Sequence, residues 1–196
     1  MRNHLPILLT FFIFLSLPSS AQLKRSFTNS ELSMALEKVI VDMPNRFAQL
    51  KGPVIAENPQ STEYATLLKL NSVESNSIVK YSGNLPVYSW MATVLSTESF
   101  EDAVKKYKGL FQQLQIMNLK LHNDFYYTLA GNYVPPSDTK KFCSSIFKLK
   151  PDLDIIADLK VDVTMQYEFP EWKVNLIVYQ GEREDYESGS LIDGGK

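Results

Sequence analysis

The sequence predicts an α+β fold in two layers, an antiparallel β-sheet with two amphipathic helices packed on one face. Two observations support this prediction. Several short segments alternate apolar and polar residues, which is typical of strands in an antiparallel sheet with one buried face. Two longer segments repeat apolar residues every three or four positions, as helices with one buried side do. The expected order is a helix, two or three strands, a second helix, and three or four strands.

The chain divides into three predicted parts. Residues 1–21 have one arginine near the start, at position 2, continue with a long apolar run and end in small residues, so we expect a secretory signal peptide cleaved before Gln22. An uncleaved anchor is the alternative. Residues 22–180 are expected to form one α+β domain, and residues 181–196 a flexible tail rich in acidic residues and glycine. The predicted product is soluble and either secreted or periplasmic.

Charge and cysteine content narrow the classes of partner. Without Arg2, 19 of the 20 basic residues remain beside 22 acidic ones, a mixed-sign balance that predicts no nucleic-acid partner and no membrane insertion after cleavage. Cys143 is the only cysteine, which excludes an intrachain disulfide. We expect a small buried apolar residue there, with an intermolecular bridge or a reactive thiol as alternatives. The absence of Asn-x-Ser/Thr sequons mildly favours a bacterial protein.

The first helix is expected to start after Thr28, because Thr28 and Glu31 have the spacing of a capping box. Pro44 would remove a backbone hydrogen bond and clash with the preceding turn, so we expect a kink or a break near Asp42. The apolar stripe of this helix consists of Leu32, Leu36, Val39, Ile40, Met43, Phe47 and Leu50.

The segment after this helix is expected to begin with a loop and continue with strands. Residues 54–61 lie between Pro53 and the first good strand pattern and contain Pro59, so we expect a connecting loop there. Strands are expected over residues 62–70, 78–81 and 87–95, with a turn over 71–77. The alternation of residues 87–95 assigns Trp90 to the core.

The second helix is expected after Ser99, which has capping-box spacing to Asp102. Its wide apolar stripe must lie on an apolar surface, and a hairpin at residues 161–180 is the expected partner. The stripe consists of Phe100, Ala103, Val104, Tyr107, Leu110, Phe111, Leu114 and Met117. Between helix and hairpin we expect an ambiguous segment at 119–129 in which a strand is preferred, a loop at 130–141 and a strand at 144–149.

Residues 161–180 give the strongest strand signal, two alternating runs separated by Pro170. We expect a hairpin with a four-residue loop at 169–172, closed by Glu168 opposite Lys173. In this register the apolar faces coincide, through the pairs Tyr167–Val174, Met165–Leu176 and Val163–Val178. The opposite face is expected to meet water and carries Asp162, Thr164, Asn175, Ile177 and Tyr179.

No motif assembles a catalytic, cofactor or metal site, so we predict no site residue and no cofactor. Cys143 and His122 would act as nucleophile and base only if the fold brought them together, and a surface histidine is the preferred interpretation. Asp152, Asp154 and Asp158 resemble a calcium loop in part. Apolar residues separate them and no glycine permits the sharp turn, so we interpret them as solvated charges.

We therefore expect an exported, non-enzymatic domain that binds a protein partner or a small apolar ligand between helix and sheet. A secreted hydrolase, whose site no recognisable motif reveals, is the alternative. The aromatic run at 125–127 and the pair Ile177 and Tyr179 are candidates for a contact surface. The element order is similar to the two-layer arrangement of secretion-chaperone-type domains, a likeness of fold that transfers no function.

Overall fold

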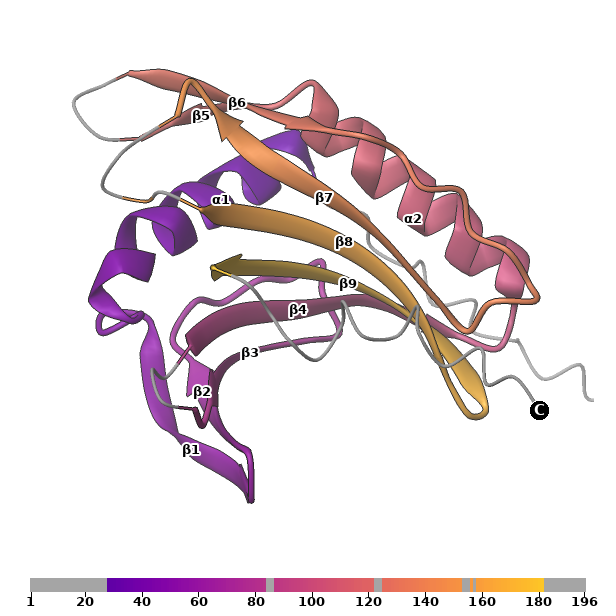
Figure 1. Ribbon diagram of the computed structural model, residues 1–196, viewed down its shortest axis with the longest axis horizontal. Coiled ribbons are helices and arrows are strands. Elements are labelled where there is room, and N and C mark those ends of the chain that lie inside the picture. Colours follow the sequence, from indigo (N-terminus) through magenta and orange to yellow (C-terminus); the bar gives the residue numbers. More distant parts are fainter. Residues whose placement is uncertain (1–27, 84–86, 122–124, 153–155, 157, 182–196) are drawn as a thin grey trace, which may run out of the picture.

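The computed structural model describes residues 28–83, 87–121, 125–152, 156 and 158–181. These residues form one antiparallel sheet of nine strands and two α-helices, a mixed α+β fold (Figure 1). The predicted signal peptide at 1–21 lies outside the described residues, as does all of the predicted tail except Gly181.

The two strands at the centre of the sheet come from distant parts of the chain. In chain order the elements are α1 (Asn29–Asp42), η1 (Met43–Asn45), β1 (Lys51–Asn58), β2 (Ser61–Thr66), β3 (Ser75–Tyr81), β4 (Val87–Thr97), α2 (Phe100–Gln115), β5 (Asn118–Lys120), β6 (Tyr126–Gly131), β7 (Phe142–Lys150), β8 (Leu159–Glu168) and β9 (Glu171–Gln180). The sheet order is β1-β2-β3-β4-β9-β8-β7-β6-β5, so β4 and β9 pair in the middle and β1 and β5 form the edges.

Both helices begin where the sequence predicts. Thr28 caps α1 by accepting a hydrogen bond from the backbone of Glu31 at 3.2 Å, and Ser99 caps α2 by accepting one from Asp102 at 3.1 Å. The break predicted near Asp42 is also confirmed. The α-helix ends there and Pro44 lies in the short 3₁₀-helix η1 that follows.

The predicted loop at 54–61 is wrong, because Lys51–Asn58 forms the edge strand β1. An edge strand tolerates Pro53, since it needs backbone partners on one side only. Two register shifts in the pairing with β2 accommodate this irregular segment. The ambiguous segment at 119–129 contains parts of two strands, β5 and β6, as the preference for a strand predicts.

The hairpin β8–β9 is confirmed, but its predicted register is wrong by two residues. Met165 pairs with Val174, and Glu168 pairs with Glu171 rather than with Lys173. The connection is the pair Phe169–Pro170, whose peptide bond is cis, whereas the prediction placed a four-residue loop at 169–172. A shift of two residues keeps each side chain on its face, so the apolar faces still coincide.

Both edges of the sheet are protected from pairing with another strand. At β5, Asn118 O accepts a hydrogen bond from Ser33 Oγ at 3.4 Å, and Lys120 N donates one to Glu37 Oε1 at 2.8 Å. Both side chains belong to α1, which lies against β5. At the other edge, the proline and the register shifts of β1 have the same effect.

The two halves of the chain repeat one arrangement, a helix followed by antiparallel strands. The last strands of the halves, β4 and β9, pair with each other. The buried positions also follow the two helix caps at equal spacing: Leu32 and Ala103, Leu36 and Tyr107, Val39 and Leu110, Ile40 and Phe111. These pairs share position and burial but not identity, so the sequence shows no repeat.

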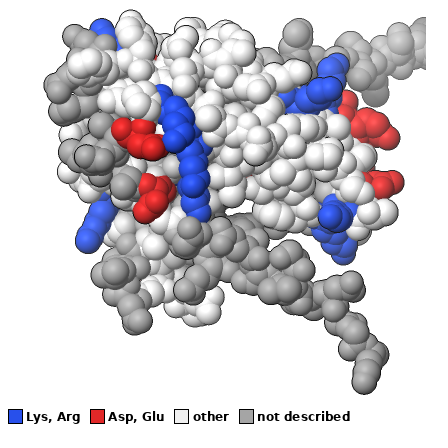
Figure 2. Space-filling model, turned by 45° about the horizontal axis from the view of Figure 1, so that its top comes forward, with Lys and Arg blue, Asp and Glu red and all other residues white. Residues whose placement is uncertain are grey.

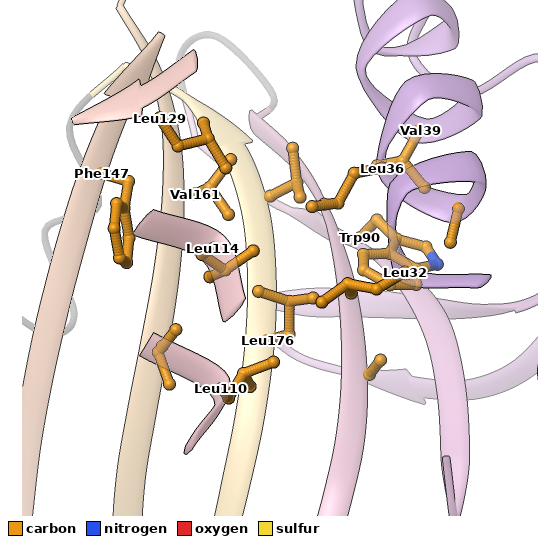
Figure 3. Packing of buried hydrophobic residues seen from close by; sticks show 14 of the residues in the cluster. Leu32, Leu36, Val39, Trp90, Leu110, Leu114, Leu129, Phe147, Val161 and Leu176 are labelled. Carbon is orange, nitrogen blue, oxygen red and sulfur yellow. The ribbon is translucent and has the colours of Figure 1, made fainter. Parts of the chain in front are cut away.

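One hydrophobic core contains side chains of both helices and of the strands. The pairing places Ala92, Val163 and Leu176 side by side on β4, β8 and β9, and all three are fully buried. Leu110 and Leu114 of α2 lie over this row (Figure 3). The backbone of α2 lies against β4, β6, β8 and β9, whereas the backbone of α1 lies against β5 and η1.

Candidate functional site

The sheet face predicted to meet water is instead buried along its central strands. Asp162, Thr164 and Asn175 have exposed fractions of 5%, 2% and 7%. Ile177 and Tyr179, predicted as an exposed contact surface, are also buried. Alternation along a strand shows which side chains share a face, but it contains no information on what covers that face. The prediction of solvated positions here is therefore wrong.

Polar groups on this face interact with one another. Ser144 Oγ donates a hydrogen bond of 2.6 Å to Asp162 Oδ1. The ammonium group of Lys160 lies 5.8 Å from the ring centre of Tyr179, in a cation–π contact. A serine beside a carboxylate still needs a general base to become a nucleophile, and within the described ranges no imidazole accompanies this pair. The arrangement favours structural hydrogen bonding over nucleophilic chemistry.

A second buried polar group lies beneath α2. Tyr107 and Ser145 share a hydrogen bond of 2.6 Å between their hydroxyl groups, and Val134 N donates to Ser145 Oγ at 2.9 Å. Cys143 lies beside them, and burial raises the pKa of its thiol, which the Tyr107 hydroxyl and the Met165 backbone offset only in part. Burial also raises the pKa of Tyr107 well above its ordinary range. The thiol is therefore protonated at neutral pH, which disfavours nucleophilic attack.

The residues considered for a catalytic pair and for a metal site lie only in part within the described structure. His122 lies outside the described residues, so the pair Cys143–His122 stays an untested alternative. Asp152 forms an ion pair with Lys150 at 3.0 Å, and Asp154 lies outside the described residues. In the part of the chain that the structure describes, no three His, Cys, Asp or Glu side chains cluster as metal ligands would.

The interior beneath α1 contains a polar group that no described residue satisfies. Trp90 of β4 is fully buried, as the sequence predicts, and its indole Nε1 has no hydrogen-bond partner. Leu32, Leu36 and Val39 of α1 lie around the indole (Figure 3). Sequence patterning places Trp90 in the core, but it cannot show that the indole N–H lacks an acceptor.

The segment between β2 and β3 joins the start of α1 to the sheet. The carboxylate of Glu31, which a capping box would direct to the helix backbone, instead accepts hydrogen bonds from Asn71 N at 3.0 Å and from the hydroxyl of Ser72. Leu68 and Ser72 of this segment are buried. Asn76 Nδ2 donates to Leu68 O at 2.9 Å and fixes the segment to β3. The segment is therefore fixed both to the start of α1 and to β3.

Exposed apolar side chains occur at the start of β6. Phe125 and Tyr126 are 65% and 66% exposed, whereas Tyr127 is buried, so the run at 125–127 contributes two of its three rings to the surface. Basic and acidic side chains lie near one another at both ends of the face in Figure 2, with a broad uncharged area between them. This face has no extended region of one charge sign, which agrees with the mixed-sign composition.

Comparisons with protein-family models, with curated proteins and with solved structures found no match. Neither α-helix in the described residues has the length and apolar composition needed to span a bilayer. Any functional inference therefore depends on the chemistry of the residues themselves.

Proposed function

We propose that this chain is an exported, non-enzymatic domain that holds a small apolar ligand between α1 and the sheet. The observation that supports this proposal is the unpartnered indole N–H of Trp90 in an apolar interior. A buried donor without an acceptor costs roughly 1–3 kcal/mol, and most buried indoles have a partner. A bound molecule with an acceptor atom would remove that cost.

In this proposal the two helices form one layer over one face of the sheet. Trp90 and Ala92 share a face of β4, because they are two residues apart on a strand. Ala92 is beside Leu176, over which α2 lies, and Trp90 is surrounded by side chains of α1 (Figure 3). The backbone of α1 lies against β5, and side chains of α1 such as Leu32 and Leu36 lie between this helix and Trp90 of β4 (Figure 3). Such a layer can separate from the sheet to admit a ligand.

A protein partner is a second candidate, which the exposed rings of Phe125 and Tyr126 favour. Aromatic residues are enriched in protein interfaces, and these two lie beside the β5–β6 pairing at one end of the sheet. Replacement of both by Ser would leave ligand binding beneath α1 unchanged, so the two candidates can be tested separately.

The proposal of export rests on the pattern of residues 1–21. Intact-mass measurement of the protein purified from its native host is expected to show Gln22 as the first residue. A mature protein that keeps the apolar run of residues 5–17 would contradict export in free form.

Ligand binding is tested with the neutral apolar fluorophore N-phenyl-1-naphthylamine. We expect saturable binding of one molecule per chain. Ala35→Leu in α1 enlarges a buried side chain beneath α1 and is expected to abolish binding, whereas Ala103→Leu makes the same change beneath α2. Because the interior beneath α2 is expected to be well packed, Ala103→Leu should cost about 1–3 kcal/mol and leave binding intact. Absence of saturable binding to the folded protein would refute the proposed function.

A further inference from the structure

We infer that the ligand beneath α1 is an uncharged amphiphile whose oxygen atom accepts a hydrogen bond from Trp90 Nε1. This inference rests on the proposed function and names the ligand class. Trp90 provides a donor only, because the indole nitrogen has no lone pair available to accept a hydrogen bond. The complementary atom must be an acceptor, such as the oxygen of a ketone, ester, ether or alcohol.

The surroundings of the indole select against a charged ligand. Trp90 pairs with Ile78 and Val178, both fully buried, and the helix residues around it are leucines and a valine. A carboxylate or an ammonium group in such surroundings would lose its hydration without an opposite charge, which costs far more than one hydrogen bond returns. A neutral oxygen loses less hydration and gains the indole donor in exchange.

Two basic residues lie at the margin of this region, Lys80, which pairs with Tyr88 from the neighbouring strand β3, and Lys51 of β1. The ammonium group of Lys51 lies 5.2 Å from the ring centre of Tyr64 and 5.0 Å from that of Tyr88. Lys51 belongs to β1, three strands from Trp90, but its ammonium group reaches Tyr88, which precedes Trp90 by two residues on β4. Its two aromatic contacts already hold the cation. A ligand that accepts from Trp90 therefore does not need Lys51.

The test compares two molecules of the same shape, 2-undecanone and 2-methyl-1-undecene, as competitors of N-phenyl-1-naphthylamine. They differ in one position, where the ketone has an oxygen and the alkene a methylene group. We expect the ketone to bind roughly 10-fold more tightly to the wild-type protein, the effect of one buried hydrogen bond. In Trp90→Phe, which keeps an aromatic ring and removes the donor, the preference should disappear.

Two control variants make the result specific. Trp172→Phe makes the same substitution at a second tryptophan, whose ring contacts Phe100 and Tyr167. This variant should keep the preference for the ketone. Lys51→Met should also keep it. If Trp90→Phe does not fold, the indole N–H signal of Trp90 in a ¹⁵N–¹H spectrum of the wild-type protein replaces it, and this signal should shift with the ketone and not with the alkene.

The outcomes separate this inference from the proposed function. If the fluorophore binds but the two competitors are equal, or if Trp90→Phe keeps the preference, the hydrogen bond to Trp90 is refuted while ligand binding stands. Binding of dodecanoate in preference to the ketone, lost in Lys51→Met, would refute the uncharged class. If the fluorophore itself does not bind, the proposed function fails.

Discussion

Replacement of Ser145 by Ala tests the buried hydroxyl group beneath α2. Ser145 is fully buried and serves two partners, the hydroxyl of Tyr107 at 2.6 Å and the backbone N–H of Val134 at 2.9 Å. The substitution removes one oxygen, leaves Val134 N unsatisfied and leaves the Tyr107 hydroxyl with the Cys143 sulfur, a weak acceptor, as its partner. A buried group without a partner costs roughly 1–3 kcal/mol and one with a weak partner costs part of that, so we expect a loss of about 2–5 kcal/mol in the free energy of unfolding. Val134 lies in the segment between β6 and β7, which loses an anchor to β7.

The measurement is urea unfolding of Ser145→Ala, Tyr107→Phe and the double variant. Tyr107→Phe removes the hydroxyl group that Ser145→Ala leaves with only a weak acceptor, so the double variant should lose less than the sum of the single losses. We expect a coupling free energy of about 0.5–3 kcal/mol between the two positions. Ser137→Ala, in the same segment but with a hydroxyl that bonds only to Thr139, should change stability by less than about 0.5 kcal/mol. Additive losses, or a loss in Ser145→Ala no larger than in Ser137→Ala, would refute the reasoning.

Three further predictions concern both faces of the sheet and the start of α1. Leu176→Ala is expected to lower the free energy of unfolding in urea by about 2–5 kcal/mol, because Leu176 is fully buried. Asn175→Ala is expected to lower it by about 1–2 kcal/mol, because Asn175 is buried on the opposite face of the sheet. An Asn175→Ala variant as stable as the wild type would show that this face is solvated. Cys143 should react with a thiol reagent only in denaturant. Burial raises the pKa of the Cys143 thiol in the folded protein above its ordinary value of 9.0. The protonated thiol therefore contributes its full stability below pH 9.0, and this contribution is lost as the pH rises through the folded pKa. Cys143→Ala should remove this dependence on pH. Glu31→Ala should cost about 1–2 kcal/mol in urea unfolding, because the buried hydroxyl of Ser72 loses its acceptor. A change no larger than that of exposed control substitutions would contradict this role of Glu31.

Local signals in the sequence predict most of the elements. Thr28 and Ser99 fix the starts of both helices because a cap needs only residues a few positions away. Pro44 fixes the end of α1 for the same reason. The hairpin is also local, yet its register depends on whether Pro170 is the first or the second of the two central turn residues. The alternation of apolar and polar side chains along the two strands fits both registers equally well.

Features that depend on distant residues could not be predicted. The local sequence of β1 does not favour a strand, because Pro53 indicates a loop. The segment becomes a strand because β2 provides backbone partners on one side. The burial of Asp162 and Asn175 depends on what covers the sheet, which no alternation pattern contains. The missing acceptor of Trp90 is a property of the whole interior beneath α1. The candidate site could therefore be recognised only after the helices and strands were placed together.

The position of β9 has a consequence for how this molecule assembles. The strand at the middle of the sheet is the last of the nine along the chain, and it pairs with β4 and β8 at once. Until residues 171–180 have been synthesised, β1–β4 and β5–β8 can form only two separate curved pieces, each with an unpaired inner edge that carries core side chains. A nascent chain that stops before Glu171 would therefore expose two unpaired strand edges at once. We expect such a chain to aggregate unless these edges are covered until the last strand is present.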